Sequence, residues 1–182
     1  MSDLVIRRMR REDLDQAVLL DCMSFSLPWP ASAYLHELNN TGGKVWVAEQ
    51  VLEAPLEYRS PFPGPVADFI QPAGARAVVG VIVVWLIVDE AHIATLAVHP
   101  ELRRQGIARK LLCVALTDAA KEGMVSALLE VRAGNIAAQD LYRQFGFEIV
   151  GRRPRYYQDN FEDALLMTLE KIDISRLSDL CG

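Results

Sequence analysis

The fold is decided within residues 98–147, at the run Arg103-Arg104-Gln105-Gly106-Ile107-Ala108-Arg109-Lys110. Just before it, residues 93–98 form a short apolar run that ends at His99-Pro100, which is typical of a buried strand leading into a turn. After it, apolar residues recur at helical spacing, and Gly123 stands where a glycine after a helix C-terminus is expected. The apolar positions are Ala108, Leu111, Leu112, Ala115, Leu116 and Ala119. The pattern predicts a strand, a tight turn and a helix with one buried face.

The start of this helix is predicted to bind an anion. The first turn of a helix has unpaired N–H groups and the positive end of the helix dipole. Gly106 leaves room for a pyrophosphate to reach those N–H groups, and the small side chain of Ala108 leaves room for the second point of close approach. Four cations add positive charge: Arg103, Arg104, Arg109 and Lys110. The run has neither P-loop nor Rossmann spacing, and taken alone it leaves open a basic, solvated helix start with a chance glycine.

A second strand and helix follow the first pair. Residues 126–131 are a short apolar strand, and the next helix has Ala138, Leu141, Tyr142 and Phe145 on one face. Asn135 suits the N-cap of that helix, and Gly146 suits the position after its C-terminus. The chain therefore repeats a strand, turn and helix unit, which is typical of an α/β fold.

This order of motifs resembles the GNAT acetyltransferases, which use acetyl-CoA. The shared pattern is a strand, an R-x-x-G-x-A helix, a strand ending in L-E-V-R-A-x-N, and a helix with L-Y-x-x-x-G-F. Within the family, residues 129–135 and the run Arg155-Tyr156-Tyr157 followed by Glu162-Asp163-Ala164 are most similar to the RimI-like branch, the N-terminal acetyltransferases of ribosomal proteins. The resemblance covers roughly residues 4–169. It implies a GNAT fold: a mixed central sheet of six to seven strands flanked by helices, with parallel central strands that splay apart.

The resemblance also implies where acetyl-CoA binds. The pantetheine arm lies between the strands at residues 96–98 and 129–131, and a backbone N–H near Leu96 or Val98 polarises the thioester oxygen. The implied cofactor-binding residues are Leu96, Ala97, Val98, Arg103, Arg104, Gln105, Gly106, Ile107, Ala108, Arg109, Asn135 and Tyr142.

Glu130 and Tyr142 are the candidate catalytic residues. Glu130 is the one acid in the strand at residues 126–131, and the resemblance implies that it is the general base, acting directly or through water. The alternative is a salt bridge to Arg132 or Arg155. Tyr142 places a phenol on a buried helix face, where the hydroxyl needs a hydrogen-bond partner. The resemblance implies that Tyr142 protonates the coenzyme A sulfur. The alternative is a tyrosine that only packs in the core. Direct attack by the amine is expected, because no Cys or Ser has an evident neighbouring base.

Two aromatic segments are candidates for binding the acceptor. The first is a proline-stiffened loop before a short helix at residues 32–38, and a hydrophobic plug between helices is its alternative. The second is predicted as a loop between closing strands at residues 148–152 and 164–169, and incidental surface tyrosines are its alternative. The residues are Phe25, Pro28 and Trp29 in the first, and Arg155, Tyr156 and Tyr157 in the second.

The expected acceptor is a free α-amine at the N-terminus of a protein or peptide that begins with Ala, Ser or Thr, ribosomal proteins included. One alternative is a small-molecule amine or a lysine side chain. A second is a non-catalytic acetyl-CoA-binding domain, and the presence of both Glu130 and Tyr142 counts against it. His92 and His99 have no partner pattern and are interpreted as structural.

The length and amino-acid composition limit the domain organisation, the partners and the cellular compartment that we expect. The 182 residues predict one domain at 1–170 and a C-terminal tail at 171–182 with one or two helical turns. A net charge of −5 argues against nucleic acid as the main partner, and no apolar segment predicts a membrane span or a secretory signal. The three cysteines are an odd number without metal-ligand spacing, so we expect no metal, a reducing cytoplasm, and a packing role for Cys113.

Residues 50–76 hold five of the nine prolines and are predicted to form a long hairpin insertion. The family makes a shorter connection at this point. Gating of substrate, dimerisation and simple disorder are all left open for this insertion, as is the oligomeric state.

Overall fold

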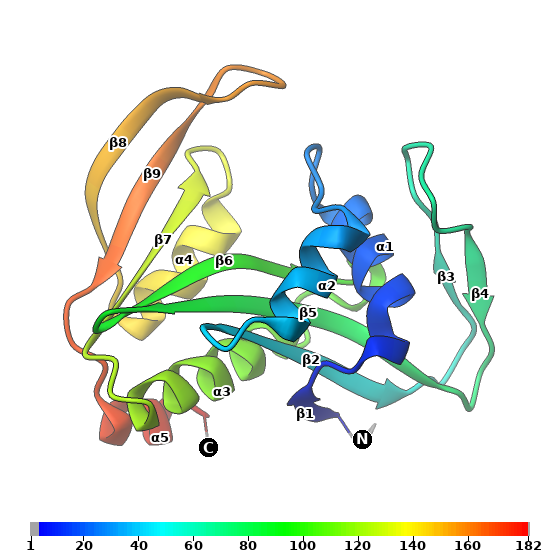
Figure 1. The fold of residues 1–182 in the computed structure, drawn as a ribbon, viewed down its shortest axis with the longest axis horizontal. Helices are drawn as coiled ribbons and strands as arrows, with labels where there is room; N and C mark the ends of the chain where they lie inside the picture. Colours follow the sequence, from blue (N-terminus) through cyan, green and yellow to red (C-terminus); the bar gives the residue numbers. More distant parts are fainter. Residues whose placement is uncertain (1–3, 182) are drawn as a thin grey trace. The chain divides into compact units, whose positions relative to one another are not determined.

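The computed structural model describes residues 4–181 (Figure 1). The strands are β1 (Val5–Arg8), β2 (Gly43–Val51), β3 (Leu56–Tyr58), β4 (Phe69–Gln71), β5 (Arg76–Ile87), β6 (Glu90–Val98), β7 (Ser126–Arg132), β8 (Glu148–Tyr157) and β9 (Glu162–Leu169). The helices are α1 (Leu14–Ser24), α2 (Ala31–Asn39), α3 (Ile107–Lys121), α4 (Ile136–Phe145) and α5 (Ile174–Cys181), with 3₁₀ turns at Arg11–Asp13 and Pro100–Leu102. In this part of the chain, no helix combines the length and the apolar composition that crossing a bilayer requires.

Seven strands form one mixed sheet in the order β1-β2-β5-β6-β7-β9-β8, which confirms the expected fold class. β6 and β7 are parallel, whereas β7 pairs antiparallel with β9 and β9 with β8. The parallel register joins Glu90–Ile93 to Ser126–Leu129 and ends there.

The chain divides into two compact units, which are described separately. The first comprises Met1–Val83 and Thr95–Leu111, and the second comprises Val84–Ala94 and Leu112–Gly182. In the first unit α1 contacts α2 and α2 contacts β2. Its most deeply buried side chains include Leu19, Leu20, Tyr34, Val47, Tyr58, Val81, Val83 and Leu111. Those of the second unit include Leu112, Leu116, Phe145, Phe147 and Met167.

Gly80 sets how closely the start of α3 packs in the first unit. A Cβ at Gly80 would lie 2.9 Å from the Leu111 side chain, 3.1 Å from that of Ile107 and 3.2 Å from the Ala97 carbonyl oxygen. Each distance is at or below the limit of normal packing, so only glycine lets the first turns of α3 approach β5 this closely. A glycine inside an apolar strand is the sequence signal for such an approach.

The segment at residues 50–76 runs from the end of β2 to the start of β5 and contains a hairpin. β3 and β4 form a separate two-stranded antiparallel sheet in which Leu56 pairs with Gln71 and Tyr58 with Phe69. At its base, the Leu52 N–H donates to the Ala75 carbonyl at 2.9 Å. The Tyr58 ring is fully buried and stacks on Phe69 with centroids 4.9 Å apart, while its hydroxyl donates to the Val78 carbonyl at 2.7 Å.

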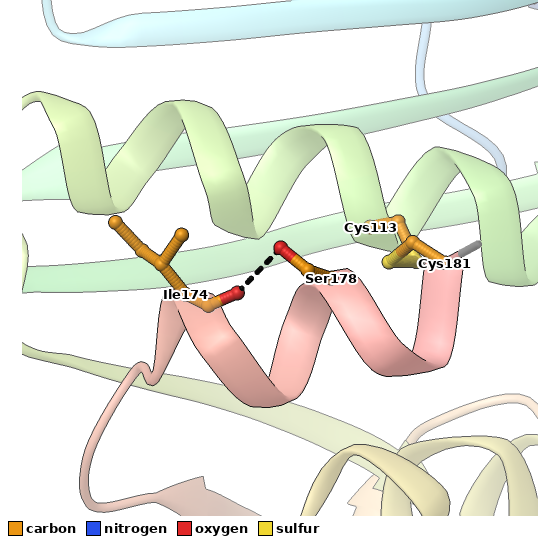
Figure 2. Close-up of a disulfide and its surroundings, with 4 residues drawn as sticks. All are labelled: Cys113, Ile174, Ser178 and Cys181. Atoms are coloured by element: carbon orange, nitrogen blue, oxygen red, sulfur yellow. Dashed lines mark hydrogen bonds between the residues drawn. A yellow bond between two sulfur atoms is a disulfide. The ribbon is translucent and has the colours of Figure 1, made fainter.

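The second unit contains a disulfide between Cys113 of α3 and Cys181 of α5 (Figure 2). The expectation that Cys113 has only a packing role is therefore wrong. Cys22 is the free cysteine among the described residues, and the odd number no longer argues for a reducing cytoplasm. The predicted helical tail is confirmed as the two turns of α5, which bury Leu177. Within α5 the Ser178 hydroxyl donates to the Ile174 carbonyl at 3.0 Å (Figure 2).

The closing hairpin is longer than predicted. In Figure 1, β8 and β9 extend together past the end of β7, and β8 continues through Tyr157. Arg155, Tyr156 and Tyr157 therefore belong to a strand and not to the predicted loop. The pairing shifts between Arg153 and Tyr157, and Arg155 has a φ of 53°. The Arg155 N–H donates to Asp163 at 2.8 Å, so a side chain supports this irregular stretch of backbone.

Candidate functional site

The turn before α3 has the backbone geometry of an anion site. Arg104 and Gly106 have φ angles of 65° and 80°, in the left-handed region, so the chain reverses sharply before the helix begins. A Cβ on Gly106 would meet no atom within 4 Å, which leaves the space in front of the first N–H groups of α3 open. Residues 103–106 are exposed. This confirms the local shape expected from the R-x-x-G-x-A run.

The predicted cationic residues of the turn differ in their surroundings. The Arg103 guanidinium donates from Nε to the Val98 carbonyl at 3.1 Å and from Nη2 to the Ser24 hydroxyl at 3.2 Å. Its side chain therefore joins the end of β6 to the end of α1. Arg104, Gln105 and Lys110 are exposed, Ala108 and Arg109 are half-buried, and Ile107 is buried. The partners of Arg103 are neutral, so Arg103, Arg104 and Lys110 all contribute positive charge at this turn, together with the N-terminus of α3.

The end of β6 lies in the same unit as the turn. Ala97 and Val98 are buried and Leu96 is half-buried. Because the β6–β7 register ends at Ile93, the backbone of Leu96–Val98 lies outside that ladder. An extended ligand arm can pair with backbone in such a position as an added strand would.

The predicted acceptor loop is held by a buried carboxylate that sequence reasoning missed. Asp21 is fully buried on α1 and accepts a 2.6 Å hydrogen bond from the Trp29 N–H. It also accepts one from the Tyr34 hydroxyl at 3.0 Å, and the Trp29 and Tyr34 rings are 5.7 Å apart. Phe25, Pro28 and Trp29 are half-buried. The sequence signal that could have identified Asp21 is its place as a single acid on the apolar face of a predicted helix.

In the second unit, Glu130 is held by residues of β8. One of its oxygens lies 3.2 Å from Arg153 Nη2, and its side chain is 26% exposed. A hydrogen bond to Glu130 raises the pKa of the Tyr156 hydroxyl, with burial contributing in the same direction. The predicted salt-bridge partners, Arg132 and Arg155, were therefore the wrong arginines. The structure brings Glu130 and Tyr156 together, a contact that the sequence analysis did not predict.

Tyr142 is 7% exposed on the buried face of α4 and lies 5.7 Å from the Phe147 ring. Burial raises the pKa of Tyr142 well above its ordinary value, so the phenol keeps its proton at neutral pH. Within residues 4–181, its hydroxyl makes no hydrogen bond to another side chain. The expected partner of this buried phenol is thus not a protein side chain, which leaves the hydroxyl available to a ligand.

The start of α4 is fixed by Asn135 and by a buried amide. The Asn135 side chain accepts from the Ala138 N–H at 3.2 Å, which confirms the N-cap, and Gly146 ends the helix with a φ of 95°. Gln139, which sequence reasoning also missed, is 2% exposed and donates to the carbonyls of Arg132 at 3.2 Å and Ala133 at 2.9 Å. These bonds hold the end of β7 against the helix that carries Tyr142.

Arg132 joins the end of β7 to the tip of the β8–β9 hairpin. Its guanidinium donates to Asp159 at 2.9 Å and to Glu162 at 3.1 Å, and it lies 3.8 Å from the centroid of Tyr157. Tyr156 meets Tyr157 edge to face, with centroids 5.2 Å apart. Burial raises the pKa of Tyr157 to about 12. The two tyrosines are therefore held by charge and ring contacts, with Tyr156 still exposed.

The predicted residues thus fall into two groups. The first unit holds the cofactor turn, the end of β6 and the Phe25 to Trp29 loop. The second holds Glu130, Asn135, Tyr142 and the Arg155 to Tyr157 segment.

Comparison with known proteins identifies the family of the chain. The model of the acetyltransferase (GNAT) family matches residues 20–147. A Bacillus subtilis (strain 168) protein named putative ribosomal protein bS18-alanine N-acetyltransferase is 32% identical over 162 residues, which are 89% of this chain and 92% of the relative.

Two solved structures share the fold. The ribosomal-protein-S18-alanine N-acetyltransferase from Escherichia coli is 24% identical with a TM-score of 0.71, covering 93% of this chain and 94% of that one. A chain of the NatC complex bound to Gag peptide and CoA is 25% identical with a TM-score of 0.69, covering 92% and 98%. The family match spans more than half of the sequence and includes the turn before α3, β7 and α4. The chain belongs to the acetyltransferase (GNAT) family.

Proposed function

We propose that this enzyme transfers the acetyl group of acetyl-CoA to the free α-amine of a protein N-terminus beginning with Ala, Ser or Thr, a ribosomal protein included. The observation that carries the proposal is the similarity to the Bacillus subtilis relative, whose name specifies an alanine N-acetyltransferase of a ribosomal protein, over 89% of this chain. The open, glycine-lined turn before α3 and the fixed aromatic segments fit this role.

The cofactor is proposed to bind at Leu96, Ala97, Val98 and the turn at residues 103–109, with Asn135 and Tyr142 as further contacts. Acetyl-CoA supplies the acetyl group as a thioester. The first N–H groups of α3 and Arg104 offer hydrogen bonds and positive charge to a pyrophosphate. The backbone of Leu96–Val98, which lies outside the β6–β7 ladder, offers N–H groups to a carbonyl oxygen.

Glu130 is proposed as the general base and Tyr142 as the general acid. Glu130 accepts a proton from the acceptor ammonium, directly or through water, so that the neutral amine attacks the acetyl carbonyl. The carbon–sulfur bond then breaks, and the Tyr142 hydroxyl donates its proton to the departing sulfur. The second proton that the attacking nitrogen loses as it becomes an amide restores the Tyr142 hydroxyl, directly or through water. Phe25, Pro28 and Trp29 are proposed to contact the acceptor, together with Arg155, Tyr156 and Tyr157.

The acidity of amines favours an N-terminus over a lysine. An α-amine has a pKa of about 7.7–8.0 and a lysine about 10.4, so deprotonating the lysine near neutral pH costs roughly 3.5 kcal/mol more. A single carboxylate that already contacts Arg153 and Tyr156 suits the more acidic amine. The aromatic segments also suit a short, uncharged first residue better than a polycation.

We further infer that residues 1–170 act as one acetyltransferase domain and residues 171–182 as its C-terminal tail. The family match runs through both compact units, which supports treating them as parts of one domain.

The test is a mass-spectrometric assay of paired peptides at equal concentration. One peptide has a free N-terminal Ala, Ser or Thr, and its pair is blocked at the N-terminus and carries an internal lysine. We expect acetylation of the first and little of the second. Faster modification of the lysine peptide, or of spermidine, contradicts the proposed acceptor.

A further inference from the structure

Asp21 is an unusual residue for the interior of this enzyme. It is fully buried in the last turns of α1, and burial raises its pKa. Its hydrogen-bond donors are the Trp29 backbone and the Tyr34 and Thr95 hydroxyls, all neutral groups. A buried carboxylate without a cation in contact is expensive to keep, and an apolar side chain of similar size fills such a space at lower cost. Its presence therefore calls for a reason beyond packing.

The positions of the three donors supply that reason. The Trp29 N–H, 2.6 Å from Oδ2, belongs to the loop between α1 and α2. The Tyr34 hydroxyl, 3.0 Å from Oδ1, belongs to α2, and the Thr95 hydroxyl, 3.2 Å from Oδ1, belongs to β6. Both oxygens are used, so the carboxylate cannot rotate without losing a bond. Asp21 thus joins the loop, α2 and β6 to α1, all inside the first unit.

Two of these connections lead to proposed substrate contacts. Trp29 is a proposed acceptor contact, and its backbone bond to Asp21 fixes the middle of the loop. Thr95 directly precedes Leu96, the first residue proposed to contact the thioester. The loop also contains Leu27, which is 60% exposed, so packing alone constrains it weakly. A loop of this kind needs a local anchor to present a binding surface of fixed shape.

We propose that Asp21 is a positioning residue that sets the affinity for the acceptor by holding the Phe25 to Trp29 loop in register with the Thr95 to Val98 end of β6. This inference rests on the proposed function. Asp21 contacts neither substrate itself. Its loss leaves the cofactor turn and the chemical groups intact but releases the surface against which the first residue of the acceptor packs.

Asp13 provides a matched control. It is also buried, at 3% exposure, and lies at the other end of α1. Its carboxylate accepts from two Arg7 nitrogens at 2.7 and 2.8 Å and from the Arg10 N–H at 2.7 Å. Asp13→Asn also disrupts buried hydrogen bonds of α1, here including an ion pair with Arg7, but none of them reaches the acceptor loop.

The experiment compares Asp21→Asn, Asp13→Asn and the wild-type enzyme on a peptide with a free N-terminal Ala. Steady-state kinetics gives kcat and KM for the peptide, calorimetry gives Kd for acetyl-CoA, and thermal unfolding gives Tm. Loss of one hydrogen bond to a charged group corresponds to a change of about tenfold or more in an equilibrium constant. We expect Asp21→Asn to raise KM about tenfold, with kcat and Kd changed less than about twofold. Asp13→Asn is expected to lower Tm with an unchanged KM.

Tyr34→Phe serves as a second variant in case Asp21→Asn does not fold. It keeps the ring beside Trp29 and removes one donor, so a smaller rise in KM is expected. An unchanged KM in the folded Asp21 and Tyr34 variants, or a Kd for acetyl-CoA that weakens as much as KM, overturns the positioning role. Absence of N-terminal acetylation by the wild-type enzyme is a different result, because it overturns the proposed function and this inference together.

Discussion

The disulfide between Cys113 and Cys181 predicts a large, measurable contribution to stability. The two half-cystines are 68 residues apart in sequence, with Cα atoms 6.0 Å apart. In the chain-entropy description, closing a loop of this length lowers the entropy of the unfolded chain by about 14.7 cal/mol/K, which is about 4.4 kcal/mol at 298 K. Measured values for disulfides are commonly about 2–4 kcal/mol. Since 1 kcal/mol shifts Tm by about 2–4 °C for a chain of this size, Cys181→Ser should lower Tm by about 4–17 °C.

The assay is differential scanning calorimetry with and without a thiol reductant. The wild-type protein should lose stability on reduction, and Cys181→Ser should be insensitive to the reductant. Cys22→Ser is the matched control, because Cys22 is the free cysteine among the described residues and its replacement should leave Tm within about 1 °C of the wild-type value.

A thiol titration separates the bond from its energetic effect. In denaturant without reductant, the wild-type chain should show one reactive thiol and the reduced chain three. Three thiols in the unreduced chain would refute the pairing. One thiol together with an unchanged Tm on reduction would instead refute the loop-entropy argument, and would mean that contacts of α5 such as that of Leu177 already hold the tail.

Four further outcomes are expected. Glu130→Gln should lower kcat by roughly 10²- to 10⁴-fold. Arg153→Gln removes the half-exposed partner of Glu130 but keeps the carboxylate, so it should change kcat less than about fivefold. Equal losses of kcat in the two variants would mean that Glu130 serves the ion pair and not catalysis. Tyr142→Phe should lower kcat by a much larger factor than it raises the Kd for acetyl-CoA, measured by calorimetry. Gly106→Trp should abolish acetyl-CoA binding, whereas Gly74→Trp, with the same φ of 80° and the same open space, should not. Burial lowers the pKa of His99, so the unfolded state binds more protons than the folded state below pH 6.5. The free energy of unfolding of the wild-type protein should therefore fall more steeply between pH 7 and 5.5 than that of His99→Gln. His36→Gln, at an exposed site, is the control.

Local patterns were enough to predict the elements that carry the site. The α4 helix was correct at both ends because Asn135 and Gly146 act within one turn of their own positions. The turn at Gly106 was recognised for the same reason. Strand β8 was not, because its extension to Tyr157 depends on a bulge that Asp163 supports from the neighbouring strand.

Contacts between distant residues were the part that sequence reasoning missed. Asp21 stands out in the sequence only as an acid on an apolar face, while one of its donors, Thr95, lies 74 residues away. The salt-bridge alternative for Glu130 named Arg132 or Arg155, whereas the structure places Arg153 of β8 beside it. The Cys113 pairing spans 68 residues, and no spacing rule identifies such a pair. In each case the contact depends on the three-dimensional fold, and no local sequence pattern distinguishes the residue that makes it from its alternatives.

The insertion at residues 50–76 is best understood through His99. The Glu101 N–H donates to His99 Nδ1 at 3.4 Å, so the proton of the neutral ring lies on Nε2, which donates to the Glu57 carbonyl at 2.9 Å. The buried Tyr58 ring meets the His99 ring edge to face, with centroids 5.1 Å apart. Strand β3 is therefore joined to the residue that immediately precedes the Pro100–Leu102 turn. This connection ties the insertion to the chain that leads into α3, the segment for which we propose cofactor binding.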